Sequence, residues 1–211
     1  MLDKITNLFR SRGEEVPGLL NVLGLGEWYT NLPAEDQQKL YEYSTIFGMG
    51  GESNQLDHSV HSTSQTQQSH LKSVGSTAVH EKDYEFAEKV LLKALDADGD
   101  NPTDRHFVYN SLIELYYKQR DERNDAIEKC IAYCEEDIDT IDAFLDAWER
   151  EYGDGPPGIP SFKRLAIILE KQGNYQDALE ICEMAIQRGL SDGTKGGYKG
   201  RKQRIQNKID G

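Results

Sequence analysis

The stretch from Ile159 to Leu190 constrains the fold of this chain more than any other. Apolar residues recur in it at the three- and four-residue spacing of an amphipathic helix, first around Phe162 and again around Leu179. Gly173 separates the two runs, and glycine ends helices because it adopts the left-handed conformation without a Cβ clash. Pro160 suits the first turn of a helix, where its missing N–H costs nothing. The stretch therefore predicts two antiparallel helices joined by a tight turn.

The order of residue types in this stretch closely resembles the helical hairpin of the tetratricopeptide repeat (TPR). Small residues, Ala166 and Ala178, stand where the two helices would cross, and Tyr175 follows the glycine turn. The resemblance implies an all-α solenoid in which each hairpin buries one face against its neighbours. It also implies a concave groove, lined by the first helix of each hairpin, that holds a peptide.

Two earlier stretches carry the same pattern less regularly. Residues 69–102 align on Ala87 as the small residue of a second helix, and residues 106–137 align on Ala126. The spacings between these alanines and Ala178 exceed the family's period of about 34 residues. Apolar residues at helical spacing around Phe144 account for part of the excess, as an extra helix near 139–152 or an extension of the preceding one.

We therefore expect an all-α fold: a short, irregular TPR-like α-solenoid of about three hairpins, flanked by helical pieces. Pro33 and the acidic residues that follow it predict the start of a helix in the N-terminal part. Residues 2–11 form a basic amphipathic pattern that suits either a membrane surface or packing onto the protein body. The expected parts are an N-terminal helical extension (1–47), a flexible linker rich in Gly, Ser and Gln (48–68), the repeats (69–192) and a basic C-terminal capping helix (193–211).

Charge argues against a chain-wide nucleic-acid surface, because the formal net charge of the 211 residues is −13 and phosphate binding needs excess Lys and Arg. The C-terminal part is the exception, since it carries six cations against a single acid, Asp210: Lys195, Lys199, Arg201, Lys202, Arg204 and Lys208. Acidic residues are concentrated in residues 135–154. This concentration suits a solvated face or a surface that attracts a basic partner.

No motif in the sequence points to catalysis, a metal or a cofactor. The acidic run from Asp96 to Asn101 lacks the glycine and the final glutamate of an EF-hand loop, so an inter-repeat turn is the better interpretation. Cys130 and Cys134 are one helical turn apart but have no second pair to complete a zinc site. Small buried thiols in a reducing cytoplasm explain all three cysteines, and no apolar run is long enough to span a membrane.

The TPR resemblance selects residues that would point into the concave groove. One TPR subgroup grips a peptide carboxylate with Lys, Asn and Arg, and Lys72 and Arg164 match two positions of that set, which is otherwise incomplete here. The groove residues form a mildly basic strip, which favours an acidic peptide. The candidate peptide-binding residues are Lys72, His80, Asn110, Tyr117, Lys163, Arg164 and Lys171.

The sequence thus predicts a non-enzymatic protein-protein interaction module, an adaptor or scaffold that binds a peptide or protein partner. Two alternatives stay open. The basic C-terminal helix could serve a nucleic-acid-associated regulatory factor, or the acidic segment and basic tail of neighbouring copies could join in a self-assembling structural protein.

Overall fold

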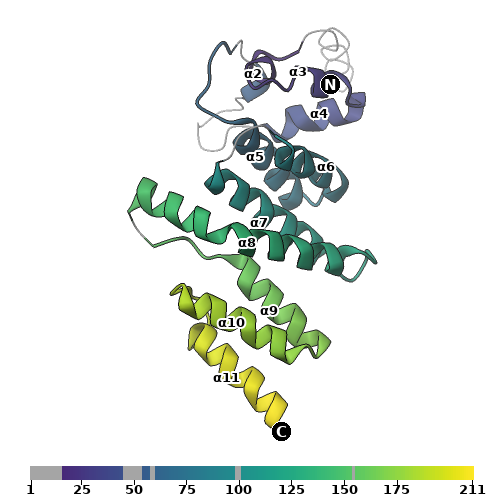
Figure 1. Cartoon of the computed structure of the whole chain (residues 1–211). Coiled ribbons are helices and arrows are strands. Elements are labelled where there is room, and N and C mark those ends of the chain that lie inside the picture. Colours follow the sequence, from purple (N-terminus) through teal and green to yellow (C-terminus); the bar gives the residue numbers. More distant parts are fainter. Residues whose placement is uncertain (1–15, 45–53, 58–59, 98–100, 154) are drawn as a thin grey trace. The chain divides into compact units, whose positions relative to one another are not determined.

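The structure is a computed structural model that describes residues 16–44, 54–57, 60–97, 101–153 and 155–211 (Figure 1). Every regular element in these ranges is a helix, which confirms the expected all-α class. The chain divides into two compact units, Met1–Gly99 and Asp100–Gly211, and each has its own buried core. The predicted amphipathic segment 2–11 lies outside the described residues.

In the first unit, three short helices precede a helical hairpin. They are α2 (Gly18–Val22), α3 (Gly26–Thr30) and α4 (Ala34–Tyr43), and α4 begins after Pro33 as the acids of its first turn predicted. Tyr29 is buried, whereas the adjacent Trp28 is only half-buried. The helix α4 packs against the hairpin, where Lys39 forms an ion pair with Asp83 at 3.1 Å.

The hairpin of this unit consists of α5 (Gln67–His80) and α6 (Tyr84–Leu95). Helix α5 begins inside the predicted linker because Thr66 and Ser69 form a reciprocal capping box. That linker also contains a short 3₁₀ turn, η1 (Gln55–Asp57), in which Leu56 is buried. Composition alone did not indicate this buried turn, since its neighbours are small and polar.

The second unit contains two hairpins and a terminal helix. Its helices are α7 (Pro102–Lys118), α8 (Ala126–Tyr152), α9 (Pro160–Gln172), α10 (Tyr175–Gln187) and α11 (Gly197–Asp210). Helix α8 runs for 27 residues, so the extra helical pattern near 139–152 is an extension of α8. It ends at Gly153 in the left-handed conformation (φ 67°).

The turns of the first and third hairpins use the same backbone conformation with different residues. Gly173 is left-handed (φ 82°) between α9 and α10, as its type predicted. Lys82 occupies the equivalent position between α5 and α6, five residues before the buried small residue of the second helix, and it too is left-handed (φ 65°). The turn geometry is thus retained where the sequence offers no glycine.

Candidate functional site

Five of the seven candidate residues lie in the second unit, on two helices that contact each other. Asn110 and Tyr117 are on α7, and Lys163, Arg164 and Lys171 are on α9. We call the surface formed by these five residues the α7–α9 face. The other two candidates, Lys72 and His80, belong to α5 in the first unit and are not placed with the face.

At the centre of the α7–α9 face, the guanidinium group of Arg164 stacks on Tyr117. Its Cζ lies 3.5 Å from the ring centroid, a close cation–π contact. The guanidinium of Arg120 lies over the same ring at 4.5 Å. The buried Nε of Arg164 has no hydrogen-bond partner, and within the described residues no carboxylate pairs with this side chain. Tyr117 therefore holds the positive charge of Arg164, which no described residue of the second unit neutralises by an ion pair.

A cavity of about 250 Å³ adjoins this pair, where the turn after α7 meets the end of α9. Its apolar lining includes Ile127 and Ile168, and the exposed Lys171 stands at its edge. Lys171 forms no ion pair with any residue of the described chain. The complete lining is Tyr117, Arg120, Asp121, Ile127, Ile168, Lys171 and Gln172.

A second, larger cavity of about 640 Å³ lies at the other end of the α7–α9 face. Asn110 and Lys163 line it together with two glycine-rich loops, 155–160 and 188–193. Asn110 precedes Tyr117 by seven residues, so the two cavities are separated by two helical turns, roughly 10 Å along α7. The α7–α9 face thus has the smaller cavity and Lys171 at one end and the larger cavity at the other.

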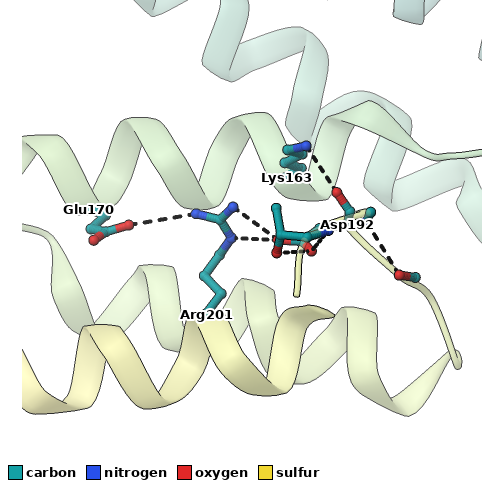
Figure 2. Close-up of polar contacts among 7 residues, drawn as sticks. Lys163, Glu170, Asp192 and Arg201 are labelled. Atoms are coloured by element: carbon teal, nitrogen blue, oxygen red, sulfur yellow. Dashed lines mark hydrogen bonds and ion pairs between the residues drawn. The ribbon is translucent and has the colours of Figure 1, made fainter. Parts of the chain in front are cut away.

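The two cations that line the larger cavity, Lys163 and Arg188, already form hydrogen bonds within the protein. Figure 2 shows the ammonium group of Lys163 donating to the backbone carbonyl of Asp192, and the Nζ–O distance is 2.9 Å. Arg188 donates from Nε and Nη2 to the carboxylate of Asp142, at 2.8 and 3.0 Å. Lys163, predicted from the resemblance as a groove cation, therefore also anchors the loop that leads to α11.

A buried polar network lies behind Asn110. Nδ1 of His106 is 2.7 Å from Oδ1 of Asp137 on α8, and both side chains are 1% exposed. Nε2 of His106 is 3.0 Å from the amide nitrogen of Asn110, one helical turn further along α7. The His106 ring stacks on Phe144, with centroids 3.8 Å apart. This network could not be predicted from the sequence, because Asp137 is distant from His106 along the chain and resembles the other acids of its run.

Three of the six cations in residues 193–211 form ion pairs within the second unit. Arg201 is buried and forms ion pairs with Asp192 at 3.0 Å and Glu170 at 3.8 Å (Figure 2). Lys208 pairs with Glu170 at 2.8 Å, and Lys202 pairs with Glu183 at 2.5 Å. These contacts hold α11 against α9 and α10, and they leave Lys195, Lys199 and Arg204 as the cations of 193–211 without an ion pair in the described chain.

The three cysteines are free and fully buried. Burial raises the pKa of the Cys182 thiol to about 11, which keeps it protonated at neutral pH. Across the described ranges, no three His, Cys, Asp or Glu side chains converge in the way a metal ion requires. The acidic run from Asp96 to Asn101 lies partly outside those ranges.

The chain is similar over nearly its whole length to a bacterial protein. The two are 29% identical over 197 residues, which cover 90% of this chain and 92% of the relative, a protein of Aquifex aeolicus (strain VF5) described as uncharacterized. No protein-family model matches the chain, and no solved structure matches it. Among the helices described, none has the length and apolarity needed to cross a membrane.

Proposed function

We propose that the second unit is a TPR-like binding module that holds an acidic segment of a partner protein along the α7–α9 face. The observation that carries the proposal is the pair Arg164 and Lys171. Both are cations without an ion pair in the described chain, and they lie around Tyr117 and its cavity in a protein of net charge −13. An acidic segment would supply the carboxylates with which Arg164 and Lys171 form no ion pair among the described residues.

The stacked arrangement of Arg164 favours recognition of a carboxylate. The planar guanidinium donates two parallel N–H bonds to the two oxygens of a carboxylate, and stacking on Tyr117 orients that plane before binding. A side chain that is already ordered loses less conformational entropy when the ligand arrives. The half-buried Ile127 offers an apolar surface beside it, so the preferred segment combines acids with an apolar residue.

A binding role suits the network behind the face better than a catalytic one. His106 and Asp137 have the geometry of a general base and the carboxylate that orients it. The remaining ring nitrogen of His106, however, lies 3.0 Å from Nδ2 of Asn110 and is not presented to a substrate. We further propose that the protein acts in the cytoplasm, a location supported by three buried, unpaired thiols.

A peptide selection with charge-reversed variants tests the proposed function. Peptides would be selected from a random phage-displayed library on the full chain, and their Kd measured by fluorescence anisotropy. We expect the selected peptides to be rich in Asp and Glu. Lys171→Glu should weaken their binding roughly tenfold, because an attractive charge becomes a repulsive one. Arg164→Gln should weaken it as well.

Lys199→Glu is the matched control, since it makes the same charge change at an exposed position of α11. It should leave the Kd unchanged, and circular dichroism should show equal helix content in all variants. A failure to select any peptide, or equal weakening by Lys171→Glu and Lys199→Glu, would contradict the proposed function.

A further inference from the structure

Two arginine guanidinium groups lie on one tyrosine ring in the second unit. The Cζ of Arg164 is 3.5 Å from the ring centroid of Tyr117, and the Cζ of Arg120 is 4.5 Å from the same centroid. Each guanidinium is attracted by the electrons of the ring, but the two positive charges repel each other. An anion that binds near both groups relieves that repulsion, so the pair favours an anionic ligand.

Arg120 is ordered and remains within reach of a ligand. Its Nη1 donates to the backbone carbonyl of Tyr117 at 2.8 Å, and its Nη2 lies 3.1 Å from Oδ2 of Asp121. Both side chains of this ion pair are exposed, so the pair contributes little and a more highly charged anion can replace Asp121. A guanidinium has five N–H donors, and these two contacts leave others for a ligand.

The charges around the smaller cavity, of about 250 Å³, match a phosphate monoester. Arg120, Lys171 and Asp121 line the cavity together with Tyr117, on which Arg164 stacks. The three cations and the one acid leave a net charge of +2. A carboxylate carries a single negative charge, whereas a phosphorylated serine carries about −2 at neutral pH and has three acceptor oxygens. One phosphate therefore balances the whole group, and one carboxylate balances half of it.

We infer that the smaller cavity receives the phosphate of a phosphorylated serine or threonine in the bound acidic segment. The inference rests on the proposed function, since the phosphorylated residue is one acid of the segment held along the α7–α9 face. Arg120 and Lys171 donate to the phosphate oxygens, and Arg164 supplies the third positive charge. Nucleic acid fits less well, because each phosphate of its backbone carries one negative charge and the whole chain has a net charge of −13.

Three matched sets of peptides test this assignment on the full chain. The sets share randomised flanking residues and differ only at the central residue, which is phosphoserine, glutamate or serine. Captured peptides would be identified by mass spectrometry. The Kd of the tightest phosphopeptide and of its glutamate and serine versions would then be measured by fluorescence anisotropy. We expect the phosphoserine version to bind about tenfold more tightly than the glutamate version, because of its additional charge.

Arg120→Gln tests whether the phosphate binds in this cavity. Loss of one of the three cations should remove most of the preference for phosphoserine over glutamate. Asp121→Asn should increase that preference, because the acid of the cavity lining is gone. Arg204→Gln is the matched control, since Arg204 is exposed on α11 and forms no ion pair in the described chain. It should keep the wild-type preference, and circular dichroism should show equal helix content in all variants.

The outcomes separate this inference from the proposed function. Equal affinities for the phosphoserine and glutamate versions, both above that of serine, overturn the phosphate assignment and still support the acidic-segment site. Equal affinities for all three overturn the inference, and the effect of Lys171→Glu on the same peptides then decides the proposed function. A preference for phosphoserine that Arg120→Gln retains overturns the assignment to this cavity. Tighter binding of a single-stranded DNA oligonucleotide than of the phosphopeptide also overturns the inference.

Discussion

At the scale of single residues, Gly75 sets how closely α5 and α6 approach. A Cβ added to Gly75 would lie 2.6 Å from Cγ and from Cδ2 of Leu91 on α6, far inside van der Waals contact. Leu91 is fully buried, so its side chain has little room to move. The helices meet where a small residue permits it, and Gly75 is a packing residue rather than a flexible one.

Gly75→Ala should therefore destabilise the first unit by about 1–3 kcal/mol, the usual cost of overpacking a core. Chemical denaturation followed by circular dichroism measures this loss. Gly158→Ala is the control, because no atom lies within 4 Å of the position its Cβ would take. Equal denaturation midpoints for Gly75→Ala and wild type would mean that α5 and α6 separate at little cost.

At the scale of elements, Asp192 joins α11 to the hairpin before it. Its carboxylate accepts hydrogen bonds from the backbone N–H and the hydroxyl of Thr194 at 2.9 and 2.6 Å. It also accepts from Nε and Nη2 of Arg201, at 3.1 and 3.0 Å. Burial opposes ionisation of Asp192, but the hydrogen bonds from Thr194 and Arg201 outweigh that effect and lower its pKa.

This lowered pKa makes the attachment of α11 sensitive to acid. Above the unfolded value of about 3.9, the ionised carboxylate contributes its full stabilisation. That stabilisation is lost as the pH falls through the lower folded pKa, because the protonated acid no longer pairs with Arg201. Asp192→Asn should cost about 2 kcal/mol at neutral pH and flatten the acid side of the stability profile.

Urea denaturation between pH 7 and pH 2 measures both effects. Asp142→Asn provides the comparison, since the pKa of Asp142 is lowered by its hydrogen bonds with Arg188 on an exposed surface, where an ion pair contributes less. If Asp192→Asn and Asp142→Asn have the same stability at neutral pH, the network around Asp192 is not what holds α11.

At the scale of the whole molecule, the division into two units predicts that residues 101–211 fold alone. This fragment keeps its own core, which includes Leu112, Tyr116, Phe144 and Phe162. It also keeps all five residues of the α7–α9 face. We expect a cooperative thermal transition for the isolated fragment and the same Kd as the full chain for a selected acidic peptide. A folded fragment that binds at least tenfold more weakly would mean that the first unit contributes to the site.

Local sequence was sufficient for some helix boundaries. Pro33, Pro160 and Gly173 act through their own backbone geometry, so the starts of α4 and α9 and the turn before α10 could be predicted without knowledge of the fold. Lys82 and Leu56 do not follow from local sequence. Lys82 adopts the left-handed conformation although it is not a glycine, and Leu56 is buried although its neighbours are polar.

The sequence by itself determined the all-α class, whereas Asn110, Tyr117, Arg164 and Lys171 were expected on one surface only because of the resemblance to TPR hairpins. Helical periodicity depends only on neighbours a few residues apart, so it is readable along the chain. Only the tertiary structure decided the partners: Arg164 on Tyr117, Asp137 behind His106, and Asp192 with Arg201. Contacts between helices depend on how whole elements pack, and no local pattern of residues encodes which distant side chain completes them.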